Sequence, residues 1–361
     1  MKISIGSQIV NGPWGGGNLF VINLSKYLIE LGHEVVYDLS SDNIDLILLT
    51  DPRSRSESSS TFNHIDINKY KKYIKPDVAV VQRINECDER KNTSNINKFY
   101  LEASNCADSV VFVSKWLEDI YLNLGMEKNK SKVIMSGSDK NIFKKYPKIR
   151  NNKKINIVTH HWSSHENKGF ETYKFLDSLL NKEKWKGVIN FSYIGNVSKD
   201  YNLPNTNIFE PLSGQELAKK ISDNDIYLTG SINEPSGNHH IEASLCGLPV
   251  LYLESGGVPE YCQGYGVSYK SVSEFESKLE EIIAKKDFFV KNLDSYPFNS
   301  IRMCQEYLEL FINLIEINKS KKQLKKHYLN RFYLMKFKLS KYTRSSFKNN
   351  LKNRIKELVK R

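Results

Sequence analysis

Short apolar runs that suit buried strands alternate with amphipathic segments of helical length along most of this 361-residue chain. In the first part, the pattern predicts strands at 2–6, 34–38, 45–50, 77–82, 109–114 and 132–135 and helices at 17–31, 95–105 and 115–124. A second series has strands near 154–160, 188–194, 206–209, 225–229 and 248–253 and helices near 169–181, 213–222, 237–246, 258–263 and 272–286. Such alternation predicts an α/β fold with parallel sheets covered by helices.

The polar, proline-containing segment 143–152 separates the two series and is interpreted as a linker. We therefore predict two Rossmann-like domains, at residues 1–145 and 151–297, then a helix at 298–317 and a tail at 318–361. Because ligands of open α/β sheets bind beyond the carboxyl ends of the strands, two such domains facing each other would enclose one cleft.

The stretch 233–249 places two carboxylates on either side of a glycine turn. Glu234 follows the apolar run 226–228, and Glu242 lies in the helix that begins after Pro235-Ser236-Gly237. The N-terminus of a helix offers unpaired N–H groups and a partial positive charge, which suit phosphates. Carboxylates beside it can accept hydrogen bonds from sugar hydroxyls. This region is therefore predicted to bind a nucleotide joined to a sugar.

Three pieces of this region resemble, in order and spacing, the signature of retaining glycosyltransferases of the GT-B fold, in the large family four. They are Glu234 with Glu242 eight positions later, Cys-Gly-Leu-Pro-Val at 246–250, and Gly-Gly-Val-Pro-Glu at 256–260. The resemblance covers about residues 1–317. It implies transfer of a sugar from a nucleoside diphosphate to an acceptor hydroxyl, and a helix at 298–317 that crosses back to the first domain. A helix cap followed by an ordinary strand and turn is the structural alternative.

The resemblance also implies roles for individual residues. Glu242 would bind the ribose hydroxyls, Glu234 would lie beside the donor sugar, and Lys168 would neutralise the leaving diphosphate. The candidate catalytic residues are Glu234 and Lys168, which the resemblance implies, and Arg83, which stands where the family differs. The implied donor-binding residues are Gly16, Gly17, His161, Ser236, Gly237, Asn238, His239 and Glu242.

The glycine-rich segment 12–18 follows the first predicted strand and opens the first helix. Glycines there allow close approach of the backbone to a phosphate or a sugar. The segment is not a dinucleotide-binding fingerprint, because the second βαβ cue and its acidic residue are missing. A flexible turn between strand and helix is the alternative.

The chain departs from the family pattern at two positions. Arg83 stands where the family usually has a histidine, so it is a candidate for neutralising a phosphate or orienting an acidic acceptor. A surface ion pair with Glu86 or Asp88 is the alternative. Lys168 fits the family, but the usual arginine is replaced by Trp162. Either the neighbouring His161 substitutes, or Lys168 and helix N–H groups hold the diphosphate alone.

No metal or other cofactor is expected beside the nucleoside-diphosphate sugar. The histidine pairs at 160–161 and 239–240 lack a recognised ligand spacing, and a pH-dependent contact with phosphate or sugar is the better use for them. Asp223 and Asp225 resemble the metal-binding pair of the other major glycosyltransferase fold, but they lie in a turn between a helix and a strand and are interpreted as structural. No second acidic residue is placed as a nucleophile, which favours attack on the same face of the sugar.

Several features bear on the compartment. The five cysteines are scattered, which indicates reduced thiols. Residues 1–6 are interpreted as a strand rather than a signal peptide, and no run approaches the ~18 to 20 apolar residues of a membrane span. A cytoplasmic protein is expected, either free or peripheral on the inner face of the membrane.

The tail carries the basic excess of the chain. Residues 318–361 contain 16 Lys and Arg and one acid, whereas residues 1–317 contain 37 basic and 40 acidic residues. An apolar stripe recurs at 4-3-4-3 spacing through Tyr328, Phe332, Met335, Leu339 and Tyr342. This pattern suits an anionic membrane surface, and thus a lipid-linked or surface-glycan acceptor in envelope polysaccharide synthesis. Packing on the first domain is the alternative, and nucleic acid is disfavoured because no recognised module accompanies the charge.

Two other functions remain open from the sequence. A sugar-nucleotide epimerase of the same fold is disfavoured, because the signature and the tail both suit transfer. An inactive GT-B homologue that acts as a binding partner or scaffold remains an alternative, because the family's arginine and histidine are missing.

Overall fold

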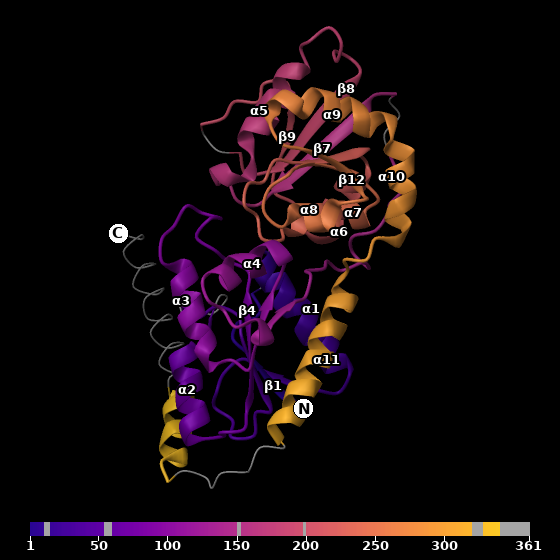
Figure 1. Ribbon diagram of the computed structural model, residues 1–361. Coiled ribbons are helices and arrows are strands. Elements are labelled where there is room, and N and C mark those ends of the chain that lie inside the picture. The colour runs from indigo at the N-terminus through magenta and orange to yellow at the C-terminus, as the bar shows by residue number, and fades with distance from the viewer. Residues whose placement is uncertain (11–14, 54–59, 150–152, 198–199, 320–327, 340–361) are drawn as a thin grey trace, which may run out of the picture.

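The computed structural model describes residues 1–10, 15–53, 60–149, 153–197, 200–319 and 328–339 (Figure 1). Within these residues, the strands form two parallel sheets of six strands each. We call residues 1–149 together with the final long helix the N-terminal half, and residues 153–299 the C-terminal half. Figure 1 shows the two halves one above the other.

The first sheet has the strand order β2-β1-β3-β4-β5-β6. Its strands are β1 (Lys2–Ile5), β2 (Glu34–Val36), β3 (Leu46–Leu49), β4 (Ala79–Ile84), β5 (Ser109–Phe112) and β6 (Ser131–Val133). Its helices are α1 (Gly16–Glu30), α2 (His64–Tyr73), α3 (Ile96–Ala103), η1 (Ser104–Cys106), α4 (Lys115–Asn123) and η2 (Lys128–Lys130). All four residues of β3 are fully buried, as expected for a parallel strand covered on both faces.

The second sheet has the order β12-β11-β10-β7-β8-β9. Its strands are β7 (Ile155–His161), β8 (Ile189–Gly195), β9 (Asn207–Phe209), β10 (Ile226–Thr229), β11 (Val250–Leu253) and β12 (Gly266–Tyr269). Its helices are η3 (Glu166–Lys168), α5 (Phe170–Leu179), α6 (Gly214–Ser222), α7 (Asn238–Leu245), α8 (Val258–Cys262), α9 (Val272–Ala284), α10 (Lys286–Asn292) and η4 (Leu293–Ser295). The α/β class with two parallel sheets is therefore confirmed.

The last long helix, α11 (Ser300–Lys319), returns to the N-terminal half. It packs on α1, where the rings of Phe20 and Tyr307 lie 5.2 Å apart. Buried residues of both helices join one cluster with β1, β3 and β4, so α11 completes the core on this face of the first sheet. Helix α11 thus lies in the region where the crossing helix at 298–317 was expected.

The elements α2, β12 and α10 were not predicted from the sequence, and neither were the short 3-10 helices η2, η3 and η4. Helix α2 buries only Ile67 and Tyr70, so its apolar period is weak. Its start is nevertheless encoded, because Asn63 and Asp66 form a reciprocal capping box. The strand β12 is a four-residue strand at the edge of its sheet, too short to give a periodic signal.

The described part of the tail contains a helix at residues 330–339 that packs beside α2. Tyr333 stacks on Tyr73 with ring centroids 4.1 Å apart, and Leu334 and Phe337 contact the same apolar cluster. The predicted stripe lies on a different face, where Phe332 and Met335 are 54% and 56% exposed. Tyr342 and the rest of the tail beyond residue 339 lie outside the described residues.

The contact with α2 shows that the tail helix packs on the N-terminal half and still presents an apolar and basic face outward. Along the described ranges of the chain, no helix combines the length and the apolar character needed to cross a bilayer.

Candidate active site

A cleft of about 790 Å³ lies between the two halves. Residues that follow strands of both sheets line it, among them Arg83 and Arg90 from the N-terminal half and Lys168, Glu234 and Glu242 from the C-terminal half. The carboxyl ends of parallel strands meet at one edge of each sheet, so the two edges bring their loops to one cavity. The predicted site residues are thereby gathered in one place.

Helix α7 begins at this cleft after a turn that requires glycine. Gly237 has a φ of 75°, and a Cβ added there would lie 2.7 Å from Cε1 of His239 and 3.1 Å from Cγ of Glu234. A side chain would therefore both strain the backbone and collide with its neighbours. The turn holds Glu234 against the start of α7, and the adjoining hydroxyl of Ser236 lies 3.3 Å from that of Ser136 in the N-terminal half.

The first residues of α1 face the start of α7 across the cleft. A Cβ added to Gly16 would lie 3.2 Å from the side chain of Asn238, so the absence of a side chain allows this approach. Gly17 also lines the cleft. Helix α1 starts without a side-chain cap, which leaves N–H groups of its first turn available to a ligand. Gly12, Pro13 and Trp14 of the same glycine-rich segment lie outside the described residues.

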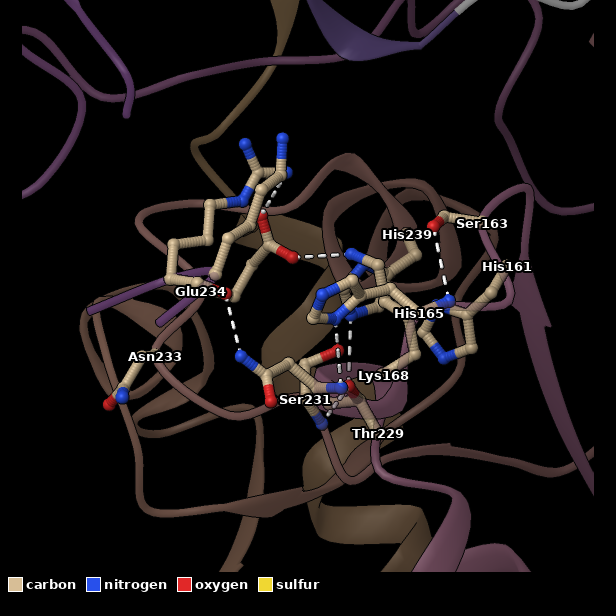
Figure 2. A network of polar contacts seen from close by, with 12 residues as sticks. His161, Ser163, His165, Lys168, Thr229, Ser231, Asn233, Glu234 and His239 are labelled. Atoms are coloured by element: carbon tan, nitrogen blue, oxygen red, sulfur yellow. Dashed lines mark hydrogen bonds and ion pairs between the residues drawn. The ribbon is translucent and has the colours of Figure 1, made fainter. Parts of the chain in front are cut away.

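Glu234 is held between two cations from the two halves. Its carboxylate lies 2.5 Å from Nζ of Lys168 and 3.1 Å from Nη2 of Arg90. Burial by itself raises the pKa of Glu234, but the charges of Arg90 and Lys168 outweigh burial and hold it well below its usual value. The Glu234 carboxylate is thus ionised, and both of its oxygens are paired with a cation. Figure 2 shows Glu234 and Lys168 in one polar network with His161 and His239.

Glu242 lies on the second turn of α7 and is 4% exposed. Its Oε2 lies 2.9 Å from Nε2 of His160, whose Nδ1 lies 3.1 Å from the hydroxyl of Tyr227. This series of hydrogen bonds, from Tyr227 on β10 through His160 on β7, fixes the orientation of the Glu242 carboxylate at the cleft. Such an oriented carboxylate is suited to accept hydrogen bonds from neighbouring hydroxyl groups of a ligand.

The rings of His161 and His239 are buried at the site. Burial lowers the pKa values of His161 and His239 well below the usual 6.5. Nε2 of His161 lies 2.6 Å from the hydroxyl of Tyr173, and Nε2 of His239 lies 2.9 Å from that of Thr229. Burial therefore disfavours protonation of both rings, which argues against His161 as a cation in place of the missing arginine.

Arg90 is the site residue that sequence reasoning missed. It belongs to the charged run Asp88-Glu89-Arg90-Lys91 shortly after β4, and it comes from the opposite half to Glu234. Asn167, next to Lys168, donates a hydrogen bond from Nδ2 to the Arg90 carbonyl oxygen at 2.7 Å. A charged loop near the carboxyl end of a buried strand was the available signal, but nothing in the local pattern indicated which half this loop would face.

The sequence matches no protein-family model and no curated protein. Solved structures are similar over most of the chain. HepE from Anabaena in complex with UDP-glucose is 16% identical, with a TM-score of 0.65 over 87% of this chain and 100% of that one. Sucrose-phosphate synthase from Thermosynechococcus elongatus is 14% identical, with a TM-score of 0.61 over 88% and 99% of the two chains. A glycosyltransferase from Rickettsia africae is 16% identical, with a TM-score of 0.60 over 87% and 98%.

At these identities the likeness establishes the fold. The chain has the GT-B glycosyltransferase fold. Trp162, at the position where the family resemblance places an arginine, is 53% exposed, and its indole carries no charge. Arg90 places a guanidinium in the same cluster from the other side of the cleft.

Arg83 does not form the surface ion pair that was one of its two interpretations. Glu86 is instead paired with Arg53, Arg90 and Lys91, at 3.9, 3.5 and 3.2 Å. Arg83 is only 5% exposed, and its guanidinium lies 4.2 Å from the centroid of the Phe20 ring. The interpretation as a surface pair is wrong, because β4 directs this side chain to the face covered by α1 and α11.

Asp223 and Asp225 accept hydrogen bonds from the segment before β7 and from β7 itself. Asp225 accepts hydrogen bonds from the backbone N–H of Asn156 at 2.9 Å and from Nζ of Lys148 at 2.7 Å. Asp223 accepts one from the backbone N–H of Ile149 at 2.8 Å. Through these hydrogen bonds, the two carboxylates hold the segment before β7 against the end of α6.

Proposed function

We propose that this protein transfers a hexose from a uridine-diphosphate sugar to an acceptor hydroxyl with retention of configuration. The observation that supports this most directly is the cleft of a GT-B fold in which the start of α7, Lys168, Glu234 and Glu242 meet. The uridine base is proposed because HepE was crystallised with UDP-glucose and with UDP.

In this proposal the donor lies along α7. Glu242 accepts hydrogen bonds from the ribose hydroxyls, and N–H groups from Gly237 to His239 contact sugar or phosphate. Lys168 and Arg90 neutralise the diphosphate, whose negative charge grows as the glycosidic bond breaks. Both cations now contact Glu234, so the donor would share them with this carboxylate.

The same contacts argue against a covalent sugar–enzyme intermediate. Double displacement needs a free carboxylate as nucleophile. Glu234 is bound by two cations and Glu242 by His160, so each is a weak nucleophile. We therefore propose same-face attack, in which the departing phosphate accepts the proton of the acceptor hydroxyl. Because Lys168 and Arg90 already supply positive charge, we propose that no divalent metal takes part. A trapped ester on either carboxylate would contradict this mechanism.

The tail supports a proposal about the acceptor. With Tyr333, Leu334 and Phe337 packed on α2, the opposite face of helix 330–339 carries exposed Phe332 and Met335. Three exposed basic residues flank them: Arg331, Lys336 and Lys338. Apolar residues ringed by basic ones suit an anionic lipid surface. We propose a cytoplasmic enzyme, peripheral at the membrane, that acts on a lipid-linked or glycan acceptor in surface-glycan synthesis.

The test begins with nucleotide binding. Calorimetric titration with UDP, GDP and ADP, in EDTA, should show binding of UDP by the wild type and weak binding by Glu242→Ala. Turnover of UDP-glucose with an acceptor panel, followed by NMR of the product anomer, tests transfer and retention. If no nucleotide binds, the alternative of an inactive GT-B homologue that serves as a partner or scaffold replaces the proposal.

A further inference from the structure

Arg83 carries a buried charge, and the residues that the structure describes supply no counter-charge for it. Arg83 lies near the end of β4 and is 5% exposed. Within the described ranges, no Asp or Glu forms an ion pair with it. The nearby carboxylates are engaged elsewhere: Glu86 by three cations, and Asp88 by the backbone N–H groups of Ile96 and Asn97. The groups around the Arg83 guanidinium are the ring of Phe20 and the phenol of Tyr307, both uncharged.

A buried cation is costly unless an anion accompanies it. An aromatic face offsets only part of that cost. The phenol of Tyr307 cannot serve as the anion, because burial raises its pKa far above neutrality. The folded protein therefore keeps a cation whose partner is missing from its own described side chains. A ligand that brings a negative charge is the simplest partner for it.

The cleft gives such a ligand access to Arg83. Arg83 lines the cleft, as do Gly16, Gly17 and Phe20 of the first turns of α1. Helix α1 is 15 residues long and has no side-chain cap, so its first turn adds N–H donors and a partial positive charge beside the guanidinium. A planar guanidinium with these amides matches the shape of a carboxylate or a phosphate group.

We infer that Arg83 and the first turn of α1 bind an anionic substituent, a carboxylate or a phosphate group, on one of the two sugar substrates. This inference rests on the proposed function, and the anion is additional to the donor diphosphate, which Lys168 and Arg90 serve. The substituent belongs either to the transferred sugar, as in a uronic acid, or to the acceptor. The two sources share one chemistry and are separated by experiment.

The experiment compares wild type, Arg83→Gln and Arg83→Lys by calorimetric titration. UDP and UDP-glucose should bind all three with affinities that agree within about twofold. If the transferred sugar carries the charge, UDP-glucuronate should bind wild type at least tenfold more tightly than Arg83→Gln, with partial recovery in Arg83→Lys. If the acceptor carries the charge, glucuronate or glucose 1-phosphate should bind the UDP-saturated wild type, and glucose should not. The affinity for these two anions should then fall at least tenfold in Arg83→Gln.

Two results would overturn the inference. One is a tenfold loss of UDP affinity in Arg83→Gln, which would assign Arg83 to the diphosphate. The other is equal binding of every anionic probe by wild type and variant. Unliganded Arg83→Gln should melt no lower than wild type, because it loses an unpaired buried charge, and a marked drop would indicate a purely structural arginine. If UDP fails to bind wild type, the proposed function fails, and titration with glucuronate and inorganic phosphate alone still tests Arg83.

Discussion

Arg90 and Glu234 join the two halves of the protein across the cleft, with Nη2 of the arginine 3.1 Å from Oε1 of the carboxylate. The loop that carries Arg90 is fixed by two further bonds from the C-terminal half. Asn167 donates to the carbonyl of Arg90 at 2.7 Å, and Asn233 donates to that of Glu89 at 3.1 Å. The proposed donor site is therefore completed by a residue from the opposite half, so its positive charge depends on how closely the halves approach.

Lys168 is expected to act mainly in the transition state, where charge builds on the leaving diphosphate. Lys168→Ala should lower kcat by about 10²- to 10³-fold, the usual cost of losing one such group. Steady-state kinetics with UDP-glucose would measure this, with Lys174→Ala, an exposed lysine of α5, as the matched control. A change confined to KM would mean that Lys168 binds substrate and transition state equally.

Glu242 is expected to bind the nucleotide. Its replacement by alanine removes hydrogen bonds to a charged acceptor, each worth about 1.5–3 kcal/mol, and should weaken UDP binding by roughly 10- to 100-fold. The control is Glu254→Ala, an exposed acid just after β11 that does not line the cleft. Equal losses in both variants, measured by calorimetry, would show that position 242 has no specific role.

Glu260 should stabilise the contact between the halves. Its two carboxylate oxygens accept hydrogen bonds from the backbone N–H groups of Lys115 and Trp116 at the start of α4, each at 2.7 Å. Loss of an anion at a helix N-terminus costs about 1–2 kcal/mol, so Glu260→Ala should lower the denaturant midpoint accordingly. The exposed Glu309 of α11 provides the control, Glu309→Ala. An unchanged midpoint in Glu260→Ala would rule out this stabilisation.

The buried histidines should make the fold sensitive to mild acid. Burial lowers the pKa of His240 to about 3, whereas an unfolded histidine titrates near 6.5. Below pH 6.5 this histidine is protonated in the unfolded chain but stays neutral in the folded protein. The free energy of unfolding therefore falls by about 1.4 kcal/mol per pH unit for each such histidine. Urea unfolding at pH 7, 6 and 5 should show a shallower slope in His240→Asn. Parallel slopes would mean that His240 is protonated in the folded state.

The exposed face of the tail helix should contribute to membrane binding. Phe332→Ser with Met335→Ser should weaken binding to phosphatidylglycerol vesicles by about tenfold or more, because each side chain is half exposed and free to insert apolar area. Binding to phosphatidylcholine should be weak for all variants, since the flanking charges need an anionic surface. Ile29→Ser, a 56% exposed residue of α1, is the control. If the control loses as much affinity, the tail helix is not the membrane contact.

Strand and helix order followed from local pattern because a strand buried on both faces must be apolar throughout. The runs at 45–50 and 226–228 illustrate this, since β3 and β10 are buried along their whole length. The glycine turn before Glu242 was equally readable, because only glycine suits the positive φ of residue 237. Helix α2 was not predicted, because two buried side chains are too few to show the 3.6-residue period of apolar residues that marks a helix.

The sequence by itself determined the two α/β series and placed Glu234 and Glu242 around a glycine turn, because burial and backbone preference are encoded locally. The crossing helix and the place of Lys168 followed from the family resemblance instead. Only the tertiary structure decided which charges meet. It paired Glu234 with Arg90 from the other half, buried Arg83 away from every Asp and Glu of the described residues, and buried His161 so that its pKa is lowered. Charge pairing and desolvation depend on neighbours distant in the chain, and a linear pattern does not contain those distances.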